Sequence, residues 1–140
     1  MQPASGGTSM YLLDTNIFLE LLLEQAEARS VQTLLQEKSP EDLFISDLAF
    51  HSIGIILYQK KAVRLFSEFV ADLFGDGGIS VVSLDTGDME CVRQVAEEFG
   101  FDFDDAYQYV AAEKYNLVLV SFDTDFDRAG RKRVVPADIR

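Results

Sequence analysis

Cysteine is almost absent from this chain. Its 140 residues include one, Cys91, so an internal disulfide is excluded and a reducing compartment fits. We therefore expect a cytoplasmic protein. Cys91 falls in a stretch with helical periodicity, and we expect it to be a buried, inert thiol rather than a nucleophile.

Long hydrophobic runs are also missing. The longest apolar stretch, LAFHSIGIILY at 48–58, contains a histidine and is too short to cross a bilayer. No basic start followed by an apolar segment and a small-residue cleavage site is present, so a signal peptide is not predicted. We expect no association with a membrane.

Basic residues are scarce. Twelve Lys and Arg face 24 Asp and Glu, and the net charge is −12. Such a surface repels nucleic-acid phosphates at long range, which argues against a protein that simply coats DNA or RNA. Five of the twelve fall in the last thirteen residues, either as a solvated tail or as a local edge that contacts phosphate: Arg128, Arg131, Lys132, Arg133 and Arg140.

The length and the hydrophobic content of 48% predict one domain with a sizeable core. The first nine residues, MQPASGGTS, are small, polar and aperiodic, and a second methionine follows at position 10. We interpret 1–9 as a flexible leader, native or added, and 10–140 as the domain.

Strand-like and helix-like segments alternate along the domain. Apolar runs predict strands, and 3.6-residue periodicity predicts helices. The expected strands are 10–13, 43–46, 79–84 and 117–121, with a short last one at 134–136. The expected helices are 17–37 (broken near 28–30), 47–59, 61–74, 86–100 and 102–116. This alternation predicts an α/β fold of three layers, in which helices flank a mostly parallel central sheet.

Acidic residues follow the predicted strands. Asp14 comes directly after the first strand, and Asp123 and Asp125 come after the fourth. A third group, Asp102, Asp104 and Asp105, opens the helix before that strand. Each acid alone is most simply a helix cap. Together they would meet at one edge of the sheet and repel one another, and Mg²⁺ or Mn²⁺ bound by oxygen ligands would offset that repulsion.

Three segments resemble a known family. LLDTNIFL, FDFDDAYQYVAAEKYNLVLVSFDTDF and VVPADI are together similar to the PIN domain, in particular to VapC-type ribonuclease toxins. The resemblance implies a site in which Asp14, Asp105 and Asp123 hold one or two divalent ions that cleave RNA. Asp125 would be an additional ligand, and the supporting polar residues would be Thr15, Asn16 and Ser121.

One acid of the family pattern is missing. The second helix of the family presents a glutamate where this chain has Ser52, beside His51. Asp47 is the nearest acid, but it lies out of register. For His51, the only histidine, we expect a side chain on a buried helix that bonds to a backbone carbonyl, rather than a metal ligand.

Three functions are consistent with these residues. The first is a Mg²⁺- or Mn²⁺-dependent endoribonuclease, the toxin of a toxin–antitoxin pair, with an antitoxin protein as partner. In it, Arg128, Arg131, Lys132 and Arg133 would contact RNA. The second is a PIN-like binding module that has lost an acid at Ser52. The third, a haloacid dehalogenase-type phosphohydrolase or a receiver domain, is disfavoured because no late lysine lies near the acids.

The oligomeric state is open from the sequence. The apolar stripe of the helix at 61–74 consists of Val63, Phe66, Val70 and Leu73. It predicts either a homodimer interface, as the resemblance suggests, or ordinary core packing.

Overall fold

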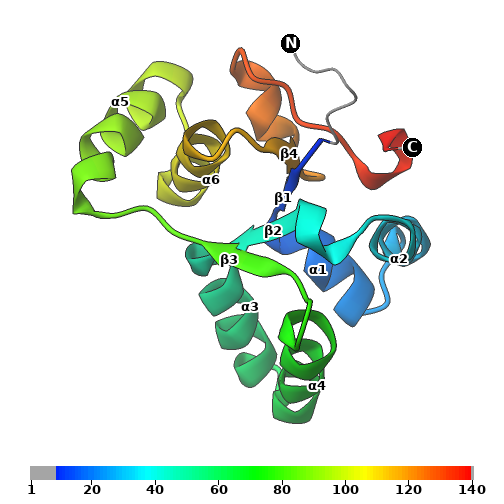
Figure 1. The fold of residues 1–140 in the computed structure, drawn as a ribbon. Helices are drawn as coiled ribbons and strands as arrows, with labels where there is room; N and C mark the ends of the chain where they lie inside the picture. Colours follow the sequence, from blue (N-terminus) through cyan, green and yellow to red (C-terminus); the bar gives the residue numbers. More distant parts are fainter. Residues whose placement is uncertain (1–8, 140) are drawn as a thin grey trace.

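A parallel four-stranded sheet organises the chain (Figure 1). The computed structural model describes residues 9–139, so the expectation for 1–9 falls, except for Ser9, outside the described residues. The strands follow the order β3-β2-β1-β4 and are β1 (Tyr11–Leu13), β2 (Leu43–Ser46), β3 (Ser80–Val82) and β4 (Val118–Val120). All three strand pairs are parallel.

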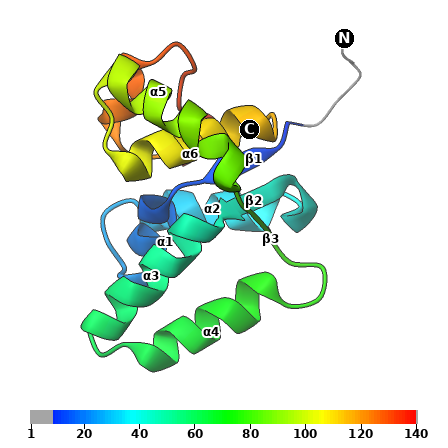
Figure 2. The ribbon, with the colours of Figure 1, turned by 90° about the vertical axis from the view of Figure 1, so that its left-hand side faces the viewer.

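Helices cover both faces of the sheet, which confirms the predicted three-layer α/β fold. Figure 2 shows α3 and α4 below the sheet and α5 and α6 above it, and residues of α1 and α2 share one core with α3 and α4. The helices are α1 (Thr15–Leu22), α2 (Ala28–Glu37), α3 (Asp47–Gln59), α4 (Val63–Phe74), α5 (Met89–Phe99) and α6 (Phe103–Lys114). The first predicted helix is broken, but at 23–27 rather than near 28–30, because residues 28–30 form the first turn of α2.

Alternating side chains of the strands pack into two separate hydrophobic cores, one on each face of the sheet. Leu13 and Val120 pack with α1 to α4, whereas Leu12 and Leu119 pack with α5 and α6. Successive residues of a strand point to opposite faces, so the uninterrupted apolar sequence of β4 is what a doubly covered strand requires.

The chain changes face beside β1. The connection from β1 to β2 runs through α1 and α2, and the connection from β3 to β4 runs through α5 and α6 on the other face. β1 and β4 are nevertheless direct neighbours in the sheet. Crevices at the carboxyl ends of strands form where connections diverge in this way, so this is where a site is expected.

Three local expectations are wrong. Residues 134–136 form no strand, and only Val134 pairs, by one isolated bridge to Val120. Cys91 is exposed, because it lies on the outer side of α5, which buries Val92 and Val95 instead. His51 is also exposed, on the outer side of α3, and its ring contacts Phe50 at 6.1 Å between centroids.

The apolar stripe of α4 is mainly core. Phe66, Val70 and Leu73 pack against the core of the lower layer, and only Val63 is exposed. More apolar surface lies next to it on α3, where Ile55 and Tyr58 are more than half exposed. None of the described helices is both long and apolar enough to cross a membrane.

Candidate metal centre

A hollow lies at the carboxyl ends of β1 and β4. Its volume is about 420 Å³, and it is open to solvent. Asp14, Asp105 and Asp123, from three separate segments, all line it. The remaining lining residues come from α1, from α3 and from the start of α6: Thr15, Asn16, Leu19, Ser52, Ile55, Ile56, Asp102 and Asp104.

Asp14 is the buried member of this set, with 8% of its surface exposed. It caps α1, since its Oδ1 accepts a hydrogen bond from the Thr15 N–H at 2.8 Å. Oδ1 also accepts from the Gln108 amide at 2.9 Å, and Oδ2 accepts from the Ser121 hydroxyl at 2.7 Å. Helix capping therefore explains one bond of Asp14, and two bonds from distant segments remain.

Asn16 and Ser121 complete this network. The Asn16 amide donates to Asp14 Oδ2 at 3.4 Å and to the Ser121 hydroxyl at 3.2 Å, and its carbonyl oxygen accepts from the Phe122 N–H at 3.1 Å. The Ser121 hydroxyl in turn accepts from the Asp123 N–H at 3.0 Å. The end of β1 is thus tied to the loop that carries Asp123.

Burial raises the pKa of Asp14. The hydrogen bonds from Ser121, Gln108 and Thr15 act in the opposite direction, because they favour the charged carboxylate. The donors therefore offset part of the cost of taking this carboxylate out of water.

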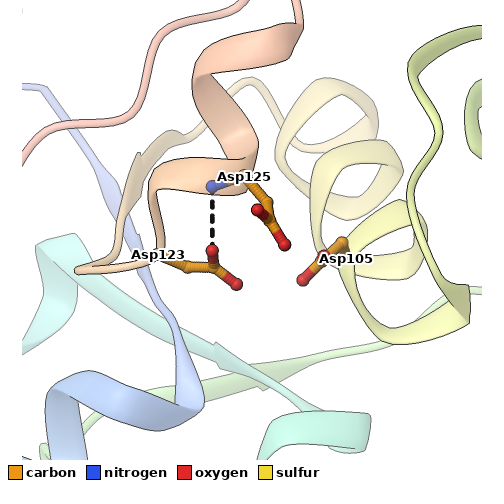
Figure 3. A group of neighbouring side chains, drawn as sticks. All are labelled: Asp105, Asp123 and Asp125. Atoms are coloured by element: carbon orange, nitrogen blue, oxygen red, sulfur yellow. Dashed lines mark hydrogen bonds between the residues drawn. The ribbon is translucent and has the colours of Figure 1, made fainter.

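Three other carboxylates converge (Figure 3), and two of them, Asp105 and Asp123, line the same hollow as Asp14. One carboxylate oxygen each of Asp105, Asp123 and Asp125 lies within 4.8 Å of the others. Asp105 comes from the first turn of α6, and the other two come from the start of the 3-10 helix Thr124–Arg128. Asp123 Oδ1 also accepts from the Asp125 N–H at 2.8 Å, so Asp123 caps that short helix. We call these three residues the carboxylate cluster.

Asp105 is the member of the carboxylate cluster whose pKa is raised. Partial burial and the negative charges of Asp102, Asp123, Asp14 and Asp125 raise its pKa to about 7. Within residues 9–139, no N–H or O–H group donates a hydrogen bond to its side chain. A nearby cation would favour the charged form of this carboxylate and lower its pKa.

The donor set fits a hard divalent cation. All candidate ligands are carboxylate oxygens, which Mg²⁺ and Mn²⁺ prefer, and Mg²⁺ commonly uses few protein ligands together with water. Asp105, Asp123 and Asp125 could hold the ion, and Asp14 lines the same hollow. Asp125, expected from the sequence as an additional ligand, lies within the cluster, whereas no Asp14 oxygen is among the mutually close ones.

Comparison with known proteins identifies the family. The sequence profile of the PIN domain matches residues 11–132, which is most of the chain. The chain belongs to the PIN domain family. A search of curated protein sequences found no match.

Solved PIN-like structures share this fold. A toxin–antitoxin complex from Klebsiella pneumoniae aligns with a TM-score of 0.70 at 20% identity, over 90% of this chain and 97% of that one. FitAcB from Neisseria gonorrhoeae aligns with a TM-score of 0.71 at 20% identity, over 93% and 100%. Mycobacterium tuberculosis VapC20, described as a toxin that cleaves the sarcin–ricin loop, aligns with a TM-score of 0.69 at 18% identity, over 89% and 98%.

In this PIN domain, Ser52 lines the hollow from α3. The helix is therefore turned so that position 52 faces the acids, as the comparison with the family pattern assumed. Asp47 is used elsewhere, since its Oδ1 accepts from the Tyr107 hydroxyl at 2.7 Å and from the Leu48 N–H at 2.8 Å. Neither residue adds a carboxylate to the carboxylate cluster.

Gln108 is the residue of this PIN domain that the sequence reasoning missed. It is 3% exposed and donates to Asp14, while its own carbonyl oxygen has no hydrogen-bond partner among the described residues. The signal was its spacing, because position 108 follows Asp105 by three residues and so shares a helix face with it. A polar side chain among the buried residues of α6 needs such a partner.

Most of the basic residues near the C-terminus contact the protein itself. Arg131 donates to the Leu117 carbonyl at 3.1 Å, and Arg133 donates to the Ser121 carbonyl at 3.1 Å and pairs with Asp127. Arg128 pairs with Asp125 at 3.0 Å. Lys132 is exposed. The expected contacts of these four residues with RNA stay a prediction.

Proposed function

We propose that this PIN domain is a metal-dependent endoribonuclease and the toxin of a toxin–antitoxin pair. The observation that carries the proposal is the convergence of Asp105, Asp123 and Asp125 within 4.8 Å, beside the buried Asp14. Membership of the PIN family supports nuclease activity. The likeness to toxin–antitoxin proteins supports the role as a toxin.

Each residue has a separate task in this proposal. Asp105, Asp123 and Asp125 would hold Mg²⁺ or Mn²⁺, with Asp14 as the ligand that reaches the ion from β1. When bound, such an ion lowers the pKa of a coordinated water and stabilises the charge that develops on a phosphate. Ser121, Asn16 and Gln108 orient Asp14, and Thr15 fixes it from the first turn of α1. No protein nucleophile is required.

RNA is proposed as the substrate because the resemblance is to ribonuclease toxins. The acidic hollow repels phosphate unless a cation is present, so RNA and metal should bind in a mutually dependent way. Arg128, Arg131, Lys132 and Arg133 lie after Asp123 in the chain and would contact the RNA backbone. The expected location of this activity is the cytoplasm.

An antitoxin is the proposed protein partner. Its support is the likeness to a toxin–antitoxin complex, together with an apolar surface around Ile55, Tyr58 and Phe66 on α3 and α4. A second copy of this chain is the alternative occupant of that surface. Light scattering of the purified chain distinguishes the two, because only the homodimer forms without a partner.

The test is RNA cleavage by matched variants. We expect the parent to cleave single-stranded RNA in Mg²⁺ or Mn²⁺, and chelator to abolish cleavage. Asp14→Asn, Asp105→Asn and Asp123→Asn should each lose at least about 100-fold, since ligands of one ion act as a unit and their effects are not additive. Asp72→Asn is the control, because Asp72 is exposed on α4 and does not line the hollow.

Two results would contradict the proposal. Cleavage that persists in Asp14→Asn would reduce Asp14 to a helix cap, since asparagine caps about as well as aspartate. A parent inactive on every RNA with added metal would favour the second candidate, a PIN-like binding module. The observation behind that candidate is Ser52, which lines the hollow without supplying the expected carboxylate.

A further inference from the structure

Arg128 is anchored at two points beside the carboxylate cluster. One Nη atom donates to Asp125 Oδ1 at 3.0 Å, and the other donates to the Gly100 carbonyl at 2.9 Å. Gly100 ends α5 in the left-handed conformation (φ 71°), and this places the carbonyl at the turn before α6. A planar guanidinium can bridge two acceptors in this way, whereas an ammonium group is a single point charge.

Within residues 9–139, Arg128 is the basic residue that forms an ion pair with the carboxylate cluster. It reaches Asp125, whereas Asp105 and Asp123 receive no ion pair within the same residues. One positive charge therefore stands against three converging carboxylates. Arg128 and a divalent cation would therefore both use the carboxylate of Asp125.

We propose that Arg128 is the internal counter-ion of the carboxylate cluster and that it competes with a divalent cation for Asp125. This inference rests on the metal site of the proposed function. Both side chains of the ion pair are about half exposed, at 51% and 45%, and ion pairs of this kind are weak in water. A divalent cation can therefore displace the guanidinium, which keeps its second anchor at Gly100.

The structure also allows the opposite role, and the two roles predict opposite signs. If Arg128 merely holds Asp125 in position for the ion, its removal should weaken metal binding. If Arg128 competes for Asp125, its removal should strengthen metal binding. The affinity for the metal alone, measured without RNA, decides between them.

The experiment is calorimetric titration with Mn²⁺ of the parent, Arg128→Gln and Arg93→Gln. Arg93→Gln is the matched control, because it removes the same charge from an exposed ion pair with Glu90 and Glu97 on α5. We expect Arg128→Gln to bind Mn²⁺ about three- to tenfold more tightly than the parent, and Arg93→Gln to stay within about twofold. Arg128→Lys, which keeps the charge without the bridging geometry, should fall between the parent and Arg128→Gln.

A second comparison isolates Asp125. In an Asp125→Asn background the shared ligand is gone, so the additional Arg128→Gln substitution should change the affinity no more than Arg93→Gln does. If the affinity for Mn²⁺ still rises three- to tenfold in that background, the positive charge of Arg128 acts at a distance and not by occupying Asp125. That result overturns competition for Asp125. Circular dichroism establishes beforehand that each variant is folded.

The outcomes separate this inference from the proposed function. A parent that binds Mn²⁺ while Arg128→Gln binds equally or more weakly overturns the competition alone. A parent that binds no Mn²⁺ removes the metal site itself, and with it both proposals. Tighter binding by Arg128→Gln that depends on Asp125 supports both.

Discussion

At the scale of single residues, Asp105 shows the effect of partial burial together with neighbouring negative charges. Its pKa is raised to about 7 from its usual value near 3.8. Between about pH 4 and pH 7 the folded protein therefore keeps a proton that the unfolded chain releases. By linkage, this group makes the folded state less stable as the pH rises through that window.

The first prediction is that Asp105→Asn removes this pH dependence. In EDTA, the melting temperature of the variant minus that of the parent should grow as the pH rises from 5 to 8, because only the parent loses the proton. Thermal denaturation followed by circular dichroism measures the difference. If the melting temperatures of the two proteins change with pH in parallel, the pKa of Asp105 is not raised in the folded protein.

Ser121 is the residue that joins the two halves of the site. Its hydroxyl is fully buried, donates to Asp14 and accepts from the Asp123 N–H. We expect Ser121→Ala to lower the free energy of unfolding by about 1–3 kcal/mol, since a buried carboxylate loses a donor. Urea denaturation measures this. Ser83→Ala, at an exposed position, should change the free energy by less than about 0.5 kcal/mol.

At the scale of elements, α3 determines how many carboxylates the hollow holds. Its register is set by Ser46, which caps the helix by accepting from the Ala49 N–H, and by the burial of Ile53 and Leu57. This register turns Ser52 toward the acids and Ile55 and Tyr58 toward solvent. One helix thus borders both the acidic hollow and the exposed apolar surface.

We therefore predict that Ser52→Glu supplies the missing carboxylate. The affinity for Mn²⁺ should rise about tenfold, a change of about 1.4 kcal/mol, because one more negative charge faces the ion. The melting temperature in EDTA should fall, since the added charge also repels Asp14 and Asp105. Ser83→Glu adds the same charge away from the hollow and is the control. Equal affinities in the two variants would mean that position 52 does not reach the ion.

For the whole molecule, the net charge of −12 and the clustered acids predict a protein that metal stabilises. A ligand that binds only the folded state adds about 2.7 kcal/mol of stability at a concentration 100 times its Kd. For a domain of this size, that corresponds to a rise in melting temperature of several degrees. Millimolar Mn²⁺ should produce such a rise in the parent, and Asp123→Asn should abolish most of it. A parent that melts at the same temperature with and without Mn²⁺ would contradict a metal site.

The sequence by itself determined the fold class and the order of elements. The strand residues 117–120 are all apolar, and the helix at 61–74 has clear 3.6-residue periodicity, so local pattern and tertiary burial agree. It also indicated that Asp14 and Asp123, which follow parallel strands, lie at one edge of the sheet together with an acid of the group Asp102, Asp104 and Asp105. The family resemblance selected Asp105 from that group and assigned the roles.

Only the tertiary structure showed which of those acids is held by hydrogen-bond donors and which lie close to one another. Asp14 accepts hydrogen bonds from three segments of the chain, whereas Asp105, Asp123 and Asp125 converge on one another. No local sequence pattern distinguishes these two situations. The bond of Gln108 to Asp14 and the bond of Arg128 to Gly100 also required the tertiary structure, because these partners lie 94 and 28 residues away along the chain. The exposure of Cys91 and His51 was mispredicted for the same physical reason: a helical pattern gives a buried side, but which residues face out depends on how the helix packs.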